Sequence, residues 1–208
     1  DEIALLVRRR RDAMQLEAKE RGQALAYVMI DVDNFKQVND IHGHTVGDAV
    51  LKTFVRRIRD VLPSEARLAR IGGDEFAFVM PFDAAARERV EDVVIRLYEA
   101  MGEAVQTDTG SFKVTLSAGL ANDCDDQSTS PRSQCAGTLM QRADIAMYQA
   151  KKQGKNRFFW FEPSMESELR FRNELETAIR LGLEKGEFVP LYEQQVDIET
   201  DKIVGFEM

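Results

Sequence analysis

The 208-residue chain has only two cysteines and no apolar run long enough to cross a bilayer. We also find no signal peptide, no convincing internal repeat and no low-complexity tract. Cys124 and Cys135 flank a polar stretch and lack partners at any metal-ligand spacing, so they do not indicate a zinc site. We expect free thiols in a reducing cytosol; a disulfide between them is an open but unneeded alternative. These absences predict a cytoplasmic protein with no membrane segment in this chain.

The chain has little positive charge relative to negative charge. With 28 basic and 36 acidic residues its net charge is -8, which disfavours nonspecific binding to nucleic acid. An anionic ligand must therefore be held by local devices such as metal ions and a few placed lysines. A hydrophobic share of 44% and a charged share of 31% are typical of a soluble globular protein. The length suits one complete domain and part of another.

Strand and helix patterns follow one another in an order that predicts an α+β fold. We expect a mixed, largely antiparallel central sheet flanked by amphipathic helices. Polar loops are expected at 41–48 and 122–134. Strands are predicted at 25–30, 67–71, 76–80, 112–121 and 158–161, and helices at 1–21, 35–40, 84–101, 138–152 and in the segment that ends before Pro63.

The acidic turn Asp31-Val32-Asp33 ends the predicted strand 25–30. Side chains alternate along a strand, so Asp31 and Asp33 point to one face with the Val32 carbonyl between them. Two carboxylates and a carbonyl oxygen are suitable ligands for a hard cation. The alternative is that Asp33 or Asn34 only caps the helix that follows.

A glycine pair followed by two carboxylates, Gly72-Gly73-Asp74-Glu75, lies between two short apolar runs. This pattern predicts a hairpin tip. The glycines remove side-chain bulk, so a large ligand could lie against the backbone while Asp74 and Glu75 project beside it. In the expected sheet this tip lies next to the strand end at Asp31, which suits a nucleotide that carries metal ions. The alternative is a charged hairpin turn without chemistry.

A basic cluster, Lys151 to Arg157, follows the helix 138–152. Positive charge is favourable at the C-terminus of a helix, so a solvated helix end is one interpretation. Phosphate binding is the other.

The hairpin sequence resembles the signature of GGDEF domains, diguanylate cyclases that condense two GTP into cyclic di-GMP and pyrophosphate. The resemblance covers about residues 1–161 and includes the segment 30–40, Gly43-His44 and Gly47-Asp48 in the family's order. We therefore expect a GGDEF domain at 1–162.

The resemblance implies roles for individual residues. Divalent metal, Mg²⁺ or Mn²⁺, would be bound by Asp31, the Val32 carbonyl and Asp74, with Glu75 assisting the second metal or the attacking hydroxyl. Gly72 and Gly73 would let ribose and base approach. The remaining substrate contacts implied are Asn39 and Asp48 to the guanine edge, Leu6 and Leu51 in the base pocket, the backbone N–H groups of Asn34 and Phe35, and Lys36, Lys151 and Lys155 to phosphates.

The family's chemistry also implies partners. Each subunit binds one GTP, so two copies must face each other in a homodimer. The runner-up is a GTP-binding regulatory module that has lost condensation activity and controls a downstream phosphodiesterase. Pro63 and Ala66 replace the Arg and Asp of the family's inhibitory site, so product inhibition through that site should be absent.

The segment 163–208 predicts a linker helix and two short strands, 188–196 and 202–208, that cannot close a core by themselves. It resembles the start of an EAL phosphodiesterase domain at Tyr192, Val196 and Gly205-Phe206-Glu207-Met208. Glu207 would be a metal ligand in a complete EAL domain, and this fragment alone should not hydrolyse cyclic di-GMP.

Overall fold

The computed structural model describes residues 17–18, 20–107, 110–123 and 132–207. The chain divides into two compact units, Asp1–Glu166 and Ser167–Met208. The prediction of a helix at 1–21 falls almost wholly outside the described residues, as do Leu6 and Cys124. The side chain of Cys135 is also outside them, so the expected state of the two thiols stays a prediction.

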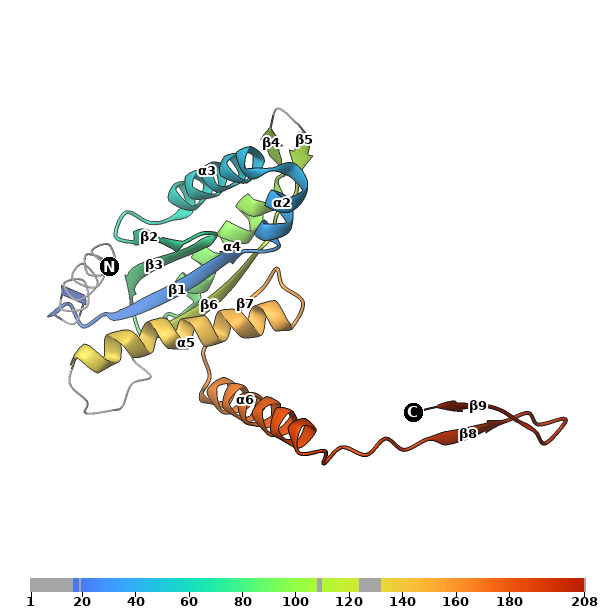
Figure 1. Cartoon of the computed structure of the whole chain (residues 1–208). Coiled ribbons are helices and arrows are strands. Elements are labelled where there is room, and N and C mark those ends of the chain that lie inside the picture. Colours follow the sequence, from blue (N-terminus) through green and yellow to red (C-terminus); the bar gives the residue numbers. More distant parts are fainter. Residues whose placement is uncertain (1–16, 19, 108–109, 124–131, 208) are drawn as a thin grey trace. The chain divides into compact units, whose positions relative to one another are not determined.

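The first unit is built on a five-stranded sheet in the order β2-β3-β1-β6-β7 (Figure 1). The central strand β1 pairs antiparallel with β3 and with β6, while β6 and β7 run parallel. The predicted mixed, largely antiparallel sheet is therefore confirmed. The strands are β1 (Ala24–Val32), β2 (Arg67–Gly72), β3 (Glu75–Phe82), β6 (Leu116–Asn122) and β7 (Phe158–Trp160).

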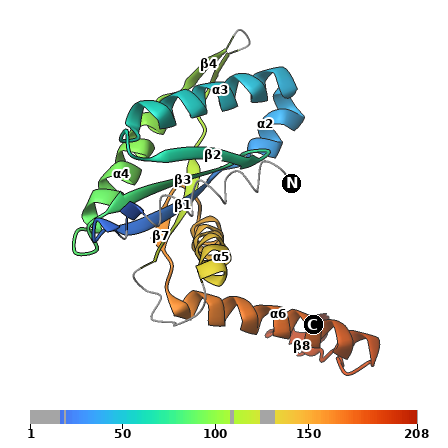
Figure 2. The ribbon, with the colours of Figure 1, turned by 90° about the vertical axis from the view of Figure 1, so that its left-hand side faces the viewer.

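Both faces of β1 are covered by helices, which explains its continuous apolar sequence. Ala26, Val28 and Ile30 pack in the core with α3 (His44–Val61) and α4 (Glu88–Gly102). Leu25, Tyr27 and Met29 alternate with them and pack with α5 (Arg132–Lys152). Figures 1 and 2 show α5 on the opposite side of the sheet from α3 and α4.

Helix α5 lies unusually close to β6 at Gly119. A Cβ atom on Gly119 would lie 1.9 Å from the carbonyl oxygen of Ala143 and 2.2 Å from the backbone nitrogen of Met147. Glycine is therefore required at this position by close packing of two backbones. The approach fixes the helix whose last turn carries Lys151.

The predicted loop 41–48 is wrong. Helix α2 (Phe35–His42) and helix α3 are joined by the single residue Gly43, whose φ of 80° lets the chain turn between them. The polar residues His44 and Thr45 begin α3 because the following Val46 and Val50 are buried in the core. Tertiary packing thus extends the helix into a sequence that looks like a loop.

The predicted strand 112–121 is also wrong, because it is two strands. β5 (Gly110–Phe112) pairs with the unpredicted β4 (Val105–Thr107), and β6 begins at Leu116. The alternating sequence runs through both strands, so it does not reveal the change of partner. Other boundaries differ: α4 begins at Glu88 rather than 84, after a turn at Asp83, and α5 begins at Arg132 rather than 138.

The second unit contains most of α6 (Pro163–Glu184) and the antiparallel pair β8 (Glu193–Val196) and β9 (Ile203–Glu207). The strand predicted at 188–196 is shorter and begins at Glu193, while Phe188 lies close to Gly182 of α6. Within the parts of the chain that the structure describes, no helix is both long and apolar enough to cross a membrane.

Candidate active site

Acidic residues from two elements meet at one end of β1. Asp31 lies directly opposite Glu75 in the β1–β3 register, and the backbone N–H of Val32 donates to the carbonyl oxygen of Asp74 at 3.3 Å. The strand end and the hairpin tip are therefore adjacent, as the sequence predicts. Asp31 is buried, whereas Asp74 and Glu75 are half-buried.

The Asp31 carboxylate has one cationic partner and two acidic neighbours. The ammonium nitrogen of Lys151 lies 2.7 Å from its Oδ2. Burial raises the pKa of Asp31; Lys151 opposes this by hydrogen bond and charge, and the charges of Asp74 and Glu75 raise the pKa further. The net direction is upward, with burial as the largest cause.

These residues fit a hard divalent cation in donor chemistry. Asp31, Asp74 and Glu75 supply carboxylate oxygens, and Mg²⁺ prefers oxygen ligands. Among the described side chains, no three His, Cys, Asp or Glu residues already stand in a metal-binding arrangement. Lys151 supplies the positive charge at Asp31 in this structure.

Asp33 is not beside Asp31 in a cation site, contrary to one interpretation of the turn. Its Oδ2 accepts hydrogen bonds from Thr115 Oγ1 at 2.7 Å and from the Asn156 N–H at 3.1 Å, and its Oδ1 accepts one from Ser117 Oγ at 2.7 Å. Both oxygens are thus occupied by neutral donors. The capping interpretation is not supported either, because Asn34, the N-cap of α2, makes no side-chain capping bond.

The predicted phosphate-binding residues gather at the start of α2. Asn34 has a φ of 59°, and its Oδ1 accepts a hydrogen bond of 2.6 Å from Lys155. Lys36 is exposed, while the Phe35 ring is buried, so Phe35 can contribute only its backbone N–H to a ligand. The first N–H groups of a helix lack partners within the helix and favour anions.

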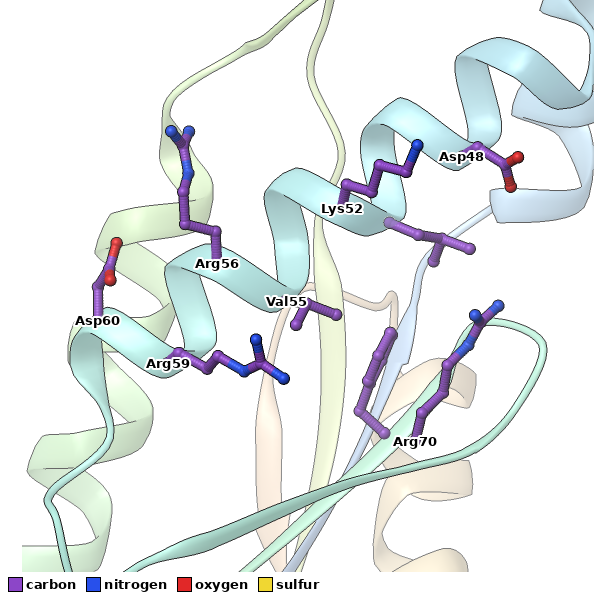
Figure 3. A pocket seen from close by; sticks show the side chains of 9 residues that line it. Asp48, Lys52, Val55, Arg56, Arg59, Asp60 and Arg70 are labelled. Carbon is purple, nitrogen blue, oxygen red and sulfur yellow. The ribbon is translucent and has the colours of Figure 1, made fainter.

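A groove of about 480 Å³ lies between α3 and the β2–β3 hairpin. It contains Asp48 and Leu51, two of the predicted base-contacting residues. Asn39 is not part of its lining and lies against Gly47 of α3. Figure 3 shows Arg59 and Arg70 directed into the space between helix and hairpin, whereas Arg56 and Asp60 point away from it.

The glycines of the hairpin tip leave open space. A Cβ on Gly72 or Gly73 would meet nothing within 4 Å, and Gly73 has a φ of 49°. Arg70 holds the tip by donating from Nε and Nη2 to the Gly73 carbonyl at 2.9 and 2.6 Å. The exposed backbone beside Asp74 can therefore accept a bulky ligand.

Residues 6–157 match the sequence profile of the family described as "Diguanylate cyclase, GGDEF domain". The chain belongs to the GGDEF family. Its structure resembles the GGDEF domain of TpbB (YfiN) from Pseudomonas aeruginosa, with a TM-score of 0.71, 28% identity, and coverage of 80% of this chain and 93% of that one. It also resembles the GGDEF domain of DgcB from Caulobacter crescentus, solved in complex with c-di-GMP, with a TM-score of 0.61, 28% identity, and coverage of 72% and 84%.

Curated relatives of this GGDEF domain are much longer proteins. The bifunctional diguanylate cyclase/cyclic di-GMP phosphodiesterase MucR of Pseudomonas aeruginosa is 31% identical over 92% of this chain and 27% of its own length. The biofilm architecture maintenance protein MbaA of Vibrio cholerae is 32% identical over 89% of this chain and 24% of its own length. The chain thus spans about a quarter of each of these two relatives.

Sequence reasoning missed two parts of this GGDEF site. The basic groove residues Lys52, Arg59 and Arg70 were given no role, although the helical spacing of Lys52 and Arg59 could have placed them on one side of α3. The donors to Asp33 were missed because Thr115, Ser117 and Asn156 are far from it in sequence. No local signal connects them.

Proposed function

We propose that this GGDEF domain is a diguanylate cyclase. Each of two condensations joins the 3'-oxygen of one GTP to the α-phosphorus of the other and releases pyrophosphate, giving cyclic di-GMP. The observation that carries the proposal is the convergence of Asp31, Asp74 and Glu75 at the end of β1, beside the groove that contains Asp48.

Different residues of the chain contact the base, the triphosphate and the ribose of GTP in this proposal. Asp48 accepts hydrogen bonds from N1–H and the exocyclic amine of guanine, with Asn39 as a second base contact and Leu6 and Leu51 beside the ring. The N–H groups of Asn34 and Phe35 and the ammonium groups of Lys36, Lys151 and Lys155 hold the triphosphate. Gly72 and Gly73 leave room for ribose at the hairpin.

Asp31, the Val32 carbonyl, Asp74 and Glu75 would hold Mg²⁺ or Mn²⁺. When bound, the metal lowers the pKa of the attacking hydroxyl and offsets charge on the leaving pyrophosphate. Lys151 would exchange its contact with Asp31 for one with phosphate. Glu75, which lies opposite Asp31 in the β1–β3 register, would help orient the hydroxyl.

One GTP per chain requires two chains for one product, so we propose a homodimer in which two sites face each other. We propose a cytoplasmic location for the reaction, because GTP is the proposed substrate. The segment 163–208 is proposed to contain a linker helix and the start of an EAL domain, and the resemblance at Tyr192 and Glu207 supports this proposal.

A second candidate is a GTP-binding regulatory module without turnover that controls the downstream EAL domain, and the ion pair between Lys151 and Asp31 is compatible with it. In that case Lys151 permanently replaces the metal's charge. Calorimetric titration of Mn²⁺ into the full chain separates the two candidates without relying on activity, since only the cyclase proposal requires metal binding that Asp74→Asn weakens.

The direct test is incubation of the chain, held as a dimer, with GTP and Mg²⁺, followed by chromatography. Cyclic di-GMP should form with the parent and not with Asp74→Asn. Binding of GTP with no product from the parent would replace the cyclase by the regulatory module.

A further inference from the structure

Asp33 joins three segments that lie far apart in sequence. It is 3% exposed, and its carboxylate accepts hydrogen bonds from Thr115, Ser117 and the backbone of Asn156. Its own N–H donates to the Thr115 carbonyl at 2.9 Å. Burial raises the pKa of Tyr98 on α4, and the negative charge of Asp33 raises it further. A buried carboxylate with this many donors fixes the backbone around it.

The loop that Asp33 holds has an unfavourable backbone. Gly154, Lys155 and Asn156 have φ values of 112°, 62° and 50°, and the last two are not glycines. Such conformations persist only where the surroundings impose them. The contacts that impose them here are Asn156 N–H to Asp33, Lys155 N–H to the Ala150 carbonyl at 3.0 Å, and Ala118 N–H to the Arg157 carbonyl at 3.1 Å.

The consequence of this loop shape is the position of Lys155. Its ammonium group lies 2.6 Å from Asn34 Oδ1, immediately before the first turn of α2. Asn34 follows Asp33 in the chain, so the residue that holds the loop is next to the acceptor of this hydrogen bond. The cation from the α5 loop therefore lies at the end of α2 whose first N–H groups lack partners within the helix.

We infer that Asp33 is a positioning residue that sets the loop 154–157 so that Lys155 and the start of α2 form one phosphate-binding cradle. Asp33 makes no contact with the nucleotide. This inference rests on the proposed binding of GTP, but not on turnover, because the cradle acts at the binding step.

The test compares Asp33→Ala with Asp33→Asn in the full chain. Alanine removes the acceptor of the Asn156 N–H. Asparagine can keep its oxygen toward Thr115 and Asn156 and donate its amide to the Ser117 hydroxyl, so it serves as the conservative rescue. We expect Asp33→Ala to weaken binding of a non-hydrolysable GTP analogue by about tenfold or more, and Asp33→Asn to stay within about threefold of the parent.

Three controls separate positioning from general stabilisation. Ser117→Ala removes a donor to Asp33 without touching the loop, so it should lower the melting temperature while leaving the analogue's affinity unchanged. Guanosine, which has no phosphate, should bind all variants alike. In a double-mutant cycle, adding Asp33→Ala to Lys155→Ala should cause no further loss of affinity, since both changes remove the same contact.

Additive losses in that cycle, or an Asp33→Ala protein that binds the analogue as well as the parent below its melting temperature, would overturn the inference. If the parent protein binds no analogue, both the inference about Asp33 and the proposed binding of GTP are overturned. A parent that binds the analogue with the expected pattern but forms no cyclic di-GMP would remove only the cyclase proposal.

Discussion

Asp31 and Asp33 are two residues apart at the same end of β1, yet their surroundings are opposite. Asp33 accepts three hydrogen bonds from neutral donors and holds the loop after α5. Asp31 has one ammonium partner, two acidic neighbours and a raised pKa. A satisfied carboxylate stabilises a scaffold, whereas a carboxylate left among like charges is available to an incoming cation. The difference separates the region proposed to bind metal and react, the reactive side, from the region that holds the scaffold together, the holding side.

The largest effect is expected on the reactive side, at Asp74. Asp74→Asn keeps size but removes charge, so production of cyclic di-GMP should fall at least about a hundredfold while the fold is kept. Rates measured by chromatography check this. The exposed Asp92→Asn on α4 is the matched charge control and should keep parent activity. If a folded Asp74→Asn protein turns over GTP like the parent, Asp74 is not part of a metal site and the proposed difference between the two regions is wrong.

Gly119→Ala should disturb both regions together, because α5 carries Lys151 and leads into the Lys155 loop. The added methyl group meets backbone atoms of Ala143 and Met147, so the helix must shift. We expect a loss of roughly 1–3 kcal/mol in the free energy of unfolding, measured by urea denaturation. Gly102→Ala, where a Cβ meets nothing within 4 Å, is the control. If the two variants have the same free energy of unfolding, α5 can shift away from β6 without loss of stability.

Asp48→Asn tests whether a charged carboxylate is also needed in the groove, where Asp48 is proposed to recognise guanine. An amide presents one acceptor and one donor instead of two acceptors, so preference for GTP over ATP should fall by about tenfold or more. Competitive titration with both nucleotides measures it. Unchanged preference, or a parent that binds both equally, would remove Asp48 from guanine recognition.

The smallest expected effect is on stability at Asp31. Its pKa is raised above the ordinary 3.8, so folding disfavours its ionised form. The penalty is absent well below pH 3.8, grows as the pH rises to the folded-state pKa, and is constant above it. Asp31→Asn should therefore be slightly more stable than the parent at neutral pH, and the difference should vanish in acid. Mn²⁺ binding should be lost in this variant. A less stable variant at neutral pH would mean that the Lys151 pair outweighs burial.

Much of the reactive side could be predicted from the sequence because its residues are local. Asp31 and Val32 are adjacent in the chain, Asp74 and Glu75 share a hairpin tip, and alternation with apolar strands places both at strand ends. The α+β sheet follows from the same periodicity. The position of Asp48 and Leu51 in one groove follows from a single turn of α3.

The holding side could not be predicted in this way. The bonds to Asp33 depend on the register of β1 against β6 and on backbone conformations at Lys155 and Asn156, neither of which leaves a local pattern. The split of the predicted strand 112–121 has the same origin, since a strand's partner is chosen by the fold. Similarly, Arg70 is a groove residue only because the hairpin folds toward α3.

The single-residue junction at Gly43 has a consequence for what the site can measure. One residue leaves no slack between α2, which begins at the phosphate contacts, and α3, which carries Asp48. The two helices cannot slide apart to follow ligands of different length. The proposed phosphate contacts and the proposed base contacts are therefore held at a fixed separation, and a nucleotide would be recognised by its length as well as by its functional groups.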